Sequence, residues 1–195
     1  AKMNVFVARA TTGQNTMAPV GRPTPTTEFV TDGGIGGPFI AASPKDGELA
    51  VTWTQLLPTS MERNIRLSRS TDHGATWSVP VTVSDTAARP MNVRGRARPA
   101  YAATGELYVT WVEYVDQPFG TTANGIYVQR YGADGAAIGT NVEVSSDTDS
   151  PGYEVPSLAV LGSTVAVVFA SGDETGAWDI RMVHSLDSAA SWQPS

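Results

Sequence analysis

The sequence contains Ser70-Thr71-Asp72-His73-Gly74-Ala75-Thr76-Trp77, a pattern typical of a tight β-hairpin that ends in a large aromatic side chain. Gly74 supplies the positive φ that a short turn needs, at no steric cost. The Asp72 carboxylate is placed to accept hydrogen bonds from backbone N–H groups a few residues on, with hydroxyl residues on either side of it. The tryptophan turns a large apolar surface back toward a core. We therefore expect a structural turn between two antiparallel strands.

The pattern returns near the end of the chain as Ser185-Leu186-Asp187-Ser188-Ala189-Ala190-Ser191-Trp192. Alanine stands where the first copy has glycine, and serine stands where it has threonine. Both copies resemble the Asp-box, or BNR repeat, of sialidases and related β-propellers. The resemblance implies blades of four antiparallel strands, with the box in the hairpin between the third and fourth strands. It also implies a structural role, away from any ligand, for Ser70, Asp72, Gly74, Thr76, Trp77, Ser185, Asp187, Ser191 and Trp192.

A strand pattern also repeats at a fixed interval. Trp53, Trp111 and Phe169 end three stretches of alternating apolar residues and follow one another at intervals of 58 residues. A period of two places the alternating side chains of each stretch on one face of a strand. A further strand follows each stretch, and the same type of strand opens the chain, at residues 4–9, 64–69, 125–130 and 179–184. No helical periodicity appears, so we predict an all-β fold.

The repeat divides the chain into blades. We predict that residues 1–35 hold the last two strands of one blade, residues 36–93 a complete blade with its box, and residues 94–152 a complete blade with a degenerate box. Residues 153–195 form an incomplete blade that ends at the second box, before any fourth strand. About three blades cannot close a ring, because propellers have 4–8 blades. We expect missing sequence or a second copy of the chain to complete a ring of six or seven.

Composition narrows the functional classes. The chain has a formal net charge of −6, a sequence pI near 4.8 and no cysteine. An acidic surface argues against nucleic acid or an anionic membrane as partner, and disulfides and cysteine-ligated metals are excluded. No apolar run approaches the ~20 residues of a membrane span. We expect a secreted or cell-surface protein, of bacterial type, from the abundance of threonine, serine, glycine and alanine.

Three arginines alternate just before a predicted inner strand, at Arg94, Arg96 and Arg98. Alternation in an extended segment places three guanidinium groups on one side, where they would suit a carboxylate, phosphate or sulfate. The alternative is a solvated loop whose arginines pair with nearby acidic residues. The loops of the same propeller face also contain Tyr153, Glu154 and Trp178, and we include these three residues in the predicted ligand site.

The sequence does not identify a catalytic set. Sialidases bind the substrate carboxylate through three arginines, the first of which precedes an inner-strand proline. The matching positions are Gly36, Ala97 and Glu154, none of them arginine. Asp147 and Asp149, with Glu154, offer oxygen ligands for calcium but lack any known loop spacing. We therefore leave the catalytic residues unknown and expect no cofactor and no metal.

Three functions remain open. The first is recognition of a glycan on the loop face of the ring, which the arginines and aromatic residues favour. The second is that of a sialidase-type glycoside hydrolase, which would be an exo-sialidase using a carboxyl acid and an activated nucleophile. The third is a scaffold whose only partner is another propeller segment. We predict glycan recognition and leave open whether the protein is an enzyme.

Overall fold

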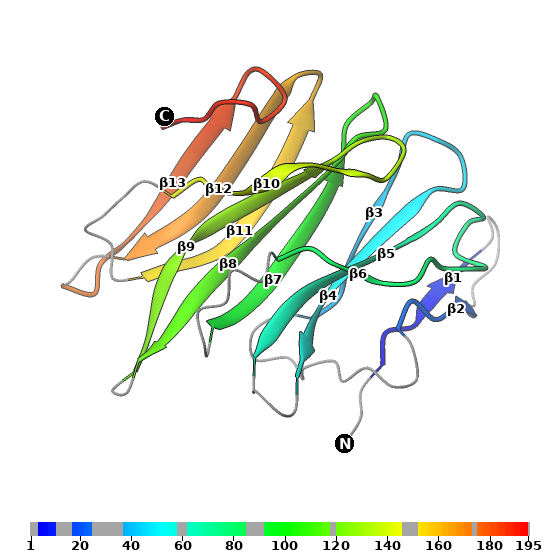
Figure 1. Ribbon diagram of the computed structural model, residues 1–195, viewed down its shortest axis with the longest axis horizontal. Helices are drawn as coiled ribbons and strands as arrows, with labels where there is room; N and C mark the ends of the chain where they lie inside the picture. The colour runs from blue at the N-terminus through cyan, green and yellow to red at the C-terminus, as the bar shows by residue number, and fades with distance from the viewer. Residues whose placement is uncertain are drawn as a thin grey trace.

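The structure is a computed structural model that describes residues 4–10, 17–24, 37–57, 62–84, 92–117, 120–145, 152–172 and 175–194. Its described part is built from strands alone, which confirms the all-β prediction (Figure 1). The strands are β1 (Val7–Arg9), β2 (Ala18–Gly21), β3 (Phe39–Ala42), β4 (Leu49–Leu56), β5 (Arg63–Ser70), β6 (Val81–Thr82), β7 (Asn92–Tyr101), β8 (Leu107–Gln117), β9 (Gly120–Tyr131), β10 (Ala137–Glu143), β11 (Gly152–Leu161), β12 (Thr164–Gly172), β13 (Trp178–Ser185) and β14 (Gln193–Pro194). Within these residues no helix has the length and hydropathy to cross a membrane.

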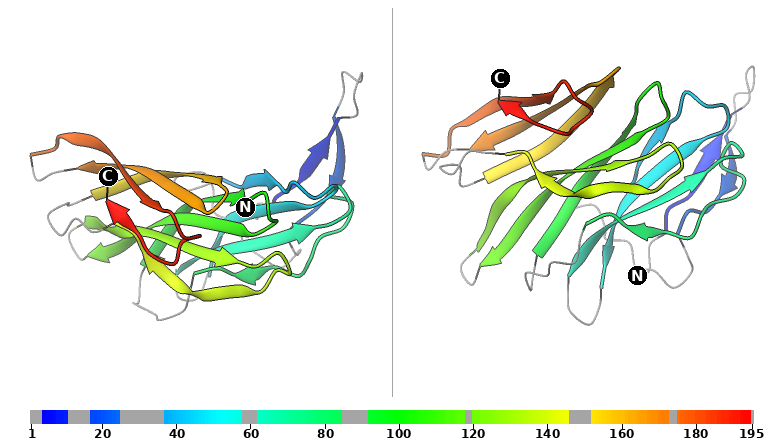
Figure 2. Two further views of the ribbon diagram at one scale, coloured as in Figure 1. Left: turned by 90° about the horizontal axis from the view of Figure 1, so that it is seen from above. Right: turned by 45° about the horizontal axis from the view of Figure 1, so that its top comes forward.

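The strands form three antiparallel sheets of four, each in simple sequence order: β3 to β6, β7 to β10 and β11 to β14. A two-stranded sheet of β1 and β2 precedes them. The sheets stand side by side like a fan (Figures 1 and 2), and β7 lies against β3 and β11. The third sheet does have a fourth strand, the two-residue β14 beside β13. Our expectation that this blade stops before any fourth strand is therefore wrong.

Large side chains of the second strands fill the spaces between the sheets. Trp53 and Trp111 are fully buried, and Phe169 is 4% exposed. Trp53 packs with residues of the N-terminal segment, Trp111 lies in a cluster shared by the first and second sheets, and Phe169 lies in a cluster shared by the second and third. The 58-residue interval seen in the sequence therefore corresponds to one core residue per sheet-to-sheet interface.

The turn at residues 70–77, here named the first box turn, connects β5 to β6. The Asp72 carboxylate accepts hydrogen bonds from the Thr76 backbone N–H at 2.8 Å, the Thr76 hydroxyl at 2.6 Å and the Ser70 hydroxyl at 2.7 Å. These bonds, led by that of the Thr76 hydroxyl, lower the pKa of Asp72 to about 2 because they favour the ionised carboxylate. The indole of Trp77 donates to the Gly74 carbonyl at 2.9 Å.

The second box turn, at residues 185–192, connects β13 to β14 with the same set of bonds to its aspartate. Asp187 accepts from the Ser191 backbone N–H at 2.9 Å, the Ser191 hydroxyl at 2.7 Å and the Ser185 hydroxyl at 2.7 Å. Its pKa falls to about 2, with the Ser191 hydroxyl as the main cause. Both turns are also tied to the first hairpin of their own sheet, by a 2.8 Å bond from His73 N to Gly47 O and its counterpart from Ser188 N to Ser163 O.

Candidate ligand-binding site

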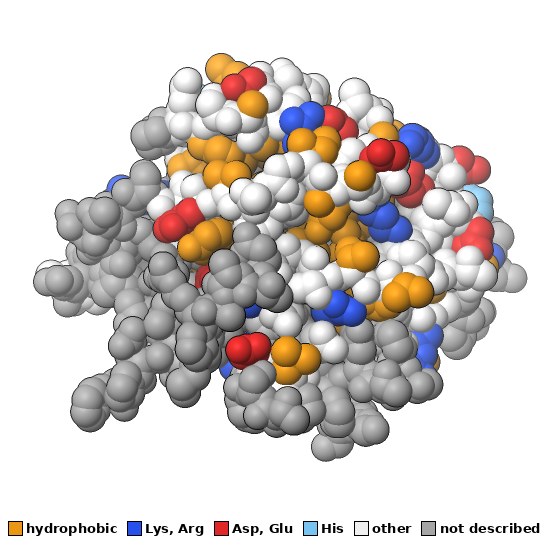
Figure 3. All heavy atoms as spheres, viewed as in Figure 1, with side chains coloured by type: hydrophobic (Ala, Val, Ile, Leu, Met, Phe, Trp, Pro, Cys, Tyr) orange, Lys and Arg blue, Asp and Glu red, His pale blue; other side chains and the backbone are white. Residues whose placement is uncertain are grey.

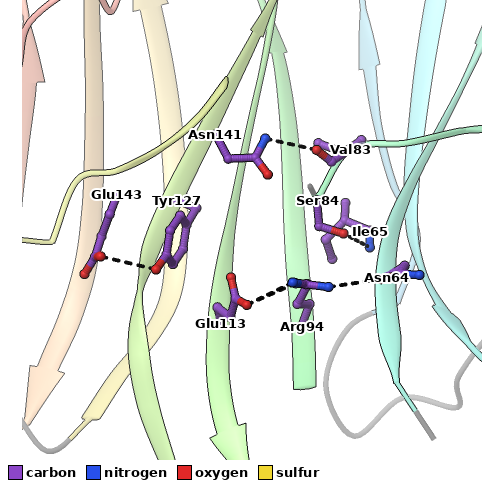
Figure 4. Close-up of polar contacts among 9 residues, drawn as sticks. All are labelled: Asn64, Ile65, Val83, Ser84, Arg94, Glu113, Tyr127, Asn141 and Glu143. Atoms are coloured by element: carbon purple, nitrogen blue, oxygen red, sulfur yellow. Dashed lines mark hydrogen bonds and ion pairs between the residues drawn. The ribbon is translucent and has the colours of Figure 1, made fainter. Parts of the chain in front are cut away.

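The predicted arginines lie along β7, the first strand of the second sheet. Arg94 is 5% exposed and forms an ion pair with Glu113 of β8, with 3.1 Å between Nη2 and Oε1. Its Nη1 donates to the Asn64 side-chain oxygen of β5 at 3.0 Å. Figure 4 shows Arg94 between these two residues, and thus bridging the first and second sheets. This guanidinium therefore holds two sheets together, and any ligand it binds must compete with that contact.

A β-bulge interrupts the alternation of the three arginines. Gly95 pairs with Val112 and Arg98 with Thr110, so two residues of β7 lie across from a single residue of β8. Arg96 is one of the two, and its φ of 58° is in the left-handed region. Because a bulge shifts the register by one residue, our expectation of three guanidinium groups on one side is wrong. Their roles as ligand contacts remain a prediction.

Arg98 occupies a different environment from Arg94. Its guanidinium carbon lies 3.7 Å from the ring centroid of Phe39 in β3, within cation–π range. Its Nε is buried and has no hydrogen-bond partner within the described ranges. Burial lowers the pKa of Arg98, and the neighbouring positive charge of Arg96 lowers it further. A partly desolvated cation with an unsatisfied donor favours an anionic or oxygen-rich ligand.

Phe39 also borders an apolar cavity. The cavity has a volume of about 230 Å³ and lies between the N-terminal strand and β3. It is lined by Val5, Phe6, Val7, Ala8, Pro38, Phe39, Ile40 and Val51. Phe39 thus contacts the Arg98 guanidinium and also lines the apolar cavity. This combination suits a ligand that has both an apolar face and a charged substituent. Arg98, Phe39 and this cavity form the candidate site.

The other predicted ligand residues lie on the third sheet. Tyr153 and Glu154 pair through their backbones with Ser171 and Ala170 at the start of β11, and their side chains lie outside the described part of the structure. Trp178 begins β13, is 54% exposed and covers Gly172 of β12. These positions belong to strands other than those of the candidate site. Their role as ligand contacts stays a prediction.

Calcium ligation stays a prediction. Asp147 and Asp149 lie outside the described residues. Among the residues that the structure does describe, no group of three or more histidine, aspartate or glutamate side chains is placed to hold a metal ion.

Sequence reasoning missed several residues of this region. Asn64 and Glu113, the partners of Arg94, carry no motif. Tyr127 stacks on Trp111 with ring centroids 5.9 Å apart, and its hydroxyl lies 3.2 Å from the Glu143 carboxylate (Figure 4). Phe39 was visible only as the apolar start of an inner strand, and its contact with Arg98 joins residues that are far apart in sequence.

No protein-family model and no curated protein sequence matches the chain. Solved structures do match. The chain is similar to an α-L-arabinanase of Penicillium chrysogenum complexed with arabinobiose, with a TM-score of 0.60, 18% identity, and coverage of 99% of this chain and 59% of that one. A sialidase of Trypanosoma rangeli gives a TM-score of 0.56 and 13% identity, with coverage of 100% and 34%.

A protein of unknown function from Dyadobacter fermentans also matches, with a TM-score of 0.58, 15% identity, and coverage of 83% of this chain and 54% of that one. The chain thus spans between about one third and three fifths of the length of these structures. At such low identity the likeness shows the fold. The prediction of a β-propeller built from four-stranded antiparallel blades is confirmed, with about three blades in this chain.

Proposed function

We propose that this chain is part of a propeller that binds a glycan beside the inner strands, with Arg98 on an acidic or oxygen-rich substituent and Phe39 against the sugar ring. The observation that carries the proposal is the Arg98 guanidinium over Phe39, with its Nε buried and unsatisfied and an apolar cavity beside the ring. Arginine forks favour carboxylates and sulfates. Aromatic rings favour the apolar face of a sugar.

Two further observations support a glycan-related role. The printed names of the similar structures include an arabinanase and a sialidase, both of which act on carbohydrates. The two box turns fit the Asp-box pattern, and we propose that they are members of that repeat. In this reading they stabilise the outer hairpins, and ligand contacts belong to the inner strands.

Part of a glycoside hydrolase is the second candidate, because the similar structures that have names are enzymes. Glu113 is the buried carboxylate nearest the predicted arginines, and its ion pair with Arg94 keeps it occupied. A hydrolase would need its acid and nucleophile from other blades. Release of reducing sugar from arabinan, or of sialic acid from a sialoside, would favour this candidate over recognition alone.

The decisive test is binding to an array of neutral and acidic oligosaccharides, followed by calorimetric titration of the tightest ligand. Arg98→Gln should weaken binding of an acidic glycan about tenfold or more, since a charge-assisted hydrogen bond contributes about 1.5–3 kcal/mol. The loss should shrink as salt is raised, because salt screens the interaction. Arg9→Gln, at an exposed arginine of β1, is the matched control and should leave binding unchanged. Equal binding by wild type and Arg98→Gln would remove Arg98 from the site.

A further inference from the structure

A cavity lies between the outer strands of the second sheet and the second box turn of the third sheet. It has a volume of about 330 Å³. Its walls come from β9, β10 and the second box turn, and the lining residues are Val128, Arg130, Ile138, Gly139, Thr140, Val142, Ala189, Ala190 and Trp192. None of these residues belongs to the candidate site, so the cavity is a separate feature of the molecule.

An irregular pairing of β10 with β9 borders this space. Three residues of β10, at 139–141, lie across from Gln129 of β9 alone. Gly139 has a φ of 69°, and a Cβ atom built on it would meet no other atom within 4 Å. In the first sheet the two residues of β6 pair with consecutive residues of β5. Bulges occur often beside binding sites, because they redirect the side chains of a strand.

The tryptophan of the second box turn forms part of the opposite wall. In the first box turn the indole of Trp77 donates to the Gly74 carbonyl at 2.9 Å. The Nε1 atom of Trp192 is buried and has no hydrogen-bond partner in the described part of the chain. The cavity wall therefore includes an aromatic ring and a donor that is not used by its own turn.

An ion pair forms the polar end of the cavity. The Nη2 atom of Arg130 lies 2.6 Å from Oε1 of Glu106, and the two side chains are 25% and 21% exposed. This hydrogen bond is the main cause that lowers the pKa of Glu106 and raises the pKa of Arg130, so both groups stay ionised. The Nε atom of Arg130 has no partner within the described ranges. Because the two charges offset each other, this end suits an uncharged group that both donates and accepts hydrogen bonds.

The other walls are apolar and extend to the surface. Val128 is 2% exposed and forms the buried side, whereas Ile138 and Val142 are 42% and 40% exposed. Figure 3 shows apolar side chains gathered at the surface in the region between the second box turn and β10 of Figure 1. Pockets for small ligands have volumes of about 300–1,000 Å³. A cavity at the lower end of this range suits a single ring that enters past β10.

We propose that this cavity binds one uncharged sugar ring, as a second glycan subsite of the propeller. The apolar face of the ring packs on Trp192 and Val142, and its hydroxyl groups exchange hydrogen bonds with the Arg130–Glu106 pair. A small rotation of the indole and the guanidinium brings their unused donors to the sugar oxygens. A carboxylate on the ring would be repelled by Glu106, and a hydrocarbon would leave both donors without a partner. The class of ligand rests on the proposed function, whereas the subsite does not depend on Arg98.

The test is a titration followed by NMR of the indole and backbone N–H signals. The probes are the methyl glycosides of glucose, galactose, xylose and arabinose, with glucuronate and cyclohexanol for comparison. Since a single ring binds weakly, each probe is added to about 50 mM, which reveals millimolar dissociation constants. We expect at least one glycoside to shift the indole signal of Trp192 and the backbone signals of Gly139 and Ala190 in a saturable way. The indole signal of Trp77 should stay unchanged, and glucuronate and cyclohexanol should bind more weakly.

Three variants connect these shifts to the cavity. Val142→Phe fills the cavity from its exposed rim and should abolish the saturable shifts. Val81→Phe is the matched control, because Val81 lies on the fourth strand of the first sheet and is 50% exposed; it should bind as the wild type does. Arg130→Gln removes the charged donor and should weaken binding about tenfold. If Arg130→Gln fails to melt cooperatively, the comparison of the two phenylalanine variants still decides.

Three outcomes would overturn the proposal. The first is the lack of a saturable Trp192 shift with all four glycosides. The second is binding of cyclohexanol as tight as that of the best glycoside, which would assign the cavity to apolar ligands. The third is glycoside binding that Val142→Phe leaves intact. The candidate site is judged separately, by the loss of acidic-glycan binding in Arg98→Gln, so failure of one site is distinguishable from failure of the other.

Discussion

The two box turns share their hydrogen bonds but differ in how their tryptophans are held. Asp72 and Asp187 accept nearly identical sets of bonds, with the backbone N–H four residues on at 2.8 and 2.9 Å. The Trp77 indole donates to the Gly74 carbonyl, whereas the Trp192 indole N–H is buried without a partner in the described structure. The carboxylate half of the motif is therefore local, and the tryptophan half depends on its surroundings.

The two tryptophans meet different surfaces of the preceding sheet. Trp77 lies against Gly21 of β2, where a Cβ atom would overlap both the indole and the Gly74 carbonyl oxygen. Trp192 lies beside a cavity of about 330 Å³ whose walls include Ile138 and Val142, near the fourth strand of the second sheet. A glycine in the neighbouring strand permits close packing in the first case. In the second case the neighbouring strand presents the branched side chains of Ile138 and Val142 instead.

The largest expected effect concerns the second of the two left-handed residues in each box turn. Gly74 has a φ of 86°, and Ala189 at the matching position has a φ of 68°. Because an L-residue there costs roughly 1–2 kcal/mol, Gly74→Ala should lower the free energy of unfolding by about 1 kcal/mol or more. Ala189→Gly should raise it by about 0.5 kcal/mol, less than the full strain because glycine gains entropy on unfolding. Urea unfolding of both variants measures this, and a loss of stability in Ala189→Gly would contradict the assigned strain.

The indole hydrogen bond gives the next effect. Trp77→Phe keeps an aromatic ring but removes the donor to the Gly74 carbonyl, so it should cost about 1 kcal/mol for the hydrogen bond. Trp192→Phe removes a donor that has no partner and should cost less. Thermal melting of the matched pair gives the comparison. Equal losses at the two sites would show that the tryptophans are held alike.

The smallest effect is a pH dependence that the two turns should share. Asp72 and Asp187 have folded pKa values of about 2, below the ordinary 3.8, so each stabilises the fold above about pH 4. This stabilisation is lost as the pH falls from about 4 to about 2. Asp72→Asn and Asp187→Asn should each flatten the decline of stability in that window by a similar amount. Unequal flattening, measured by denaturant titration at several pH values, would break the equivalence of the two carboxylates.

The strands and the box turns of the repeat could be predicted from the sequence because each depends on residues that are close together in the chain. The alternation around Trp53 and Trp111 predicts strands by itself, and the Asp72 pattern predicts its turn because every partner lies within a few residues. The sequence did not predict that the Ser84 and Ser145 hydroxyls accept hydrogen bonds from the backbone N–H groups of Ile65 and Ile126, since a single serine has no pattern. The constant interval of 19 residues from Ile65 and Ile126 would have revealed them.

The candidate site was less predictable, because it depends on register and on distant partners. The alternation of Arg94, Arg96 and Arg98 assumes a regular strand, and one bulge invalidates it. The partners that distinguish the arginines, Asn64 for one and Phe39 for another, come from the preceding sheet. The packing of one sheet on the next determines that the Arg94 guanidinium forms structural contacts and that the Arg98 guanidinium keeps an unsatisfied donor.

The backbone bonds from His73 to Gly47 and from Ser188 to Ser163 bear on protein engineering. Each bond joins the tips of two hairpins that belong to the same sheet, so within each of these two sheets the two tips are held together. An epitope or a fusion partner inserted at either tip would separate two turns at once. Designers who wish to graft sequences onto this scaffold should therefore treat the two turns as one unit and look for permissive positions elsewhere along the chain.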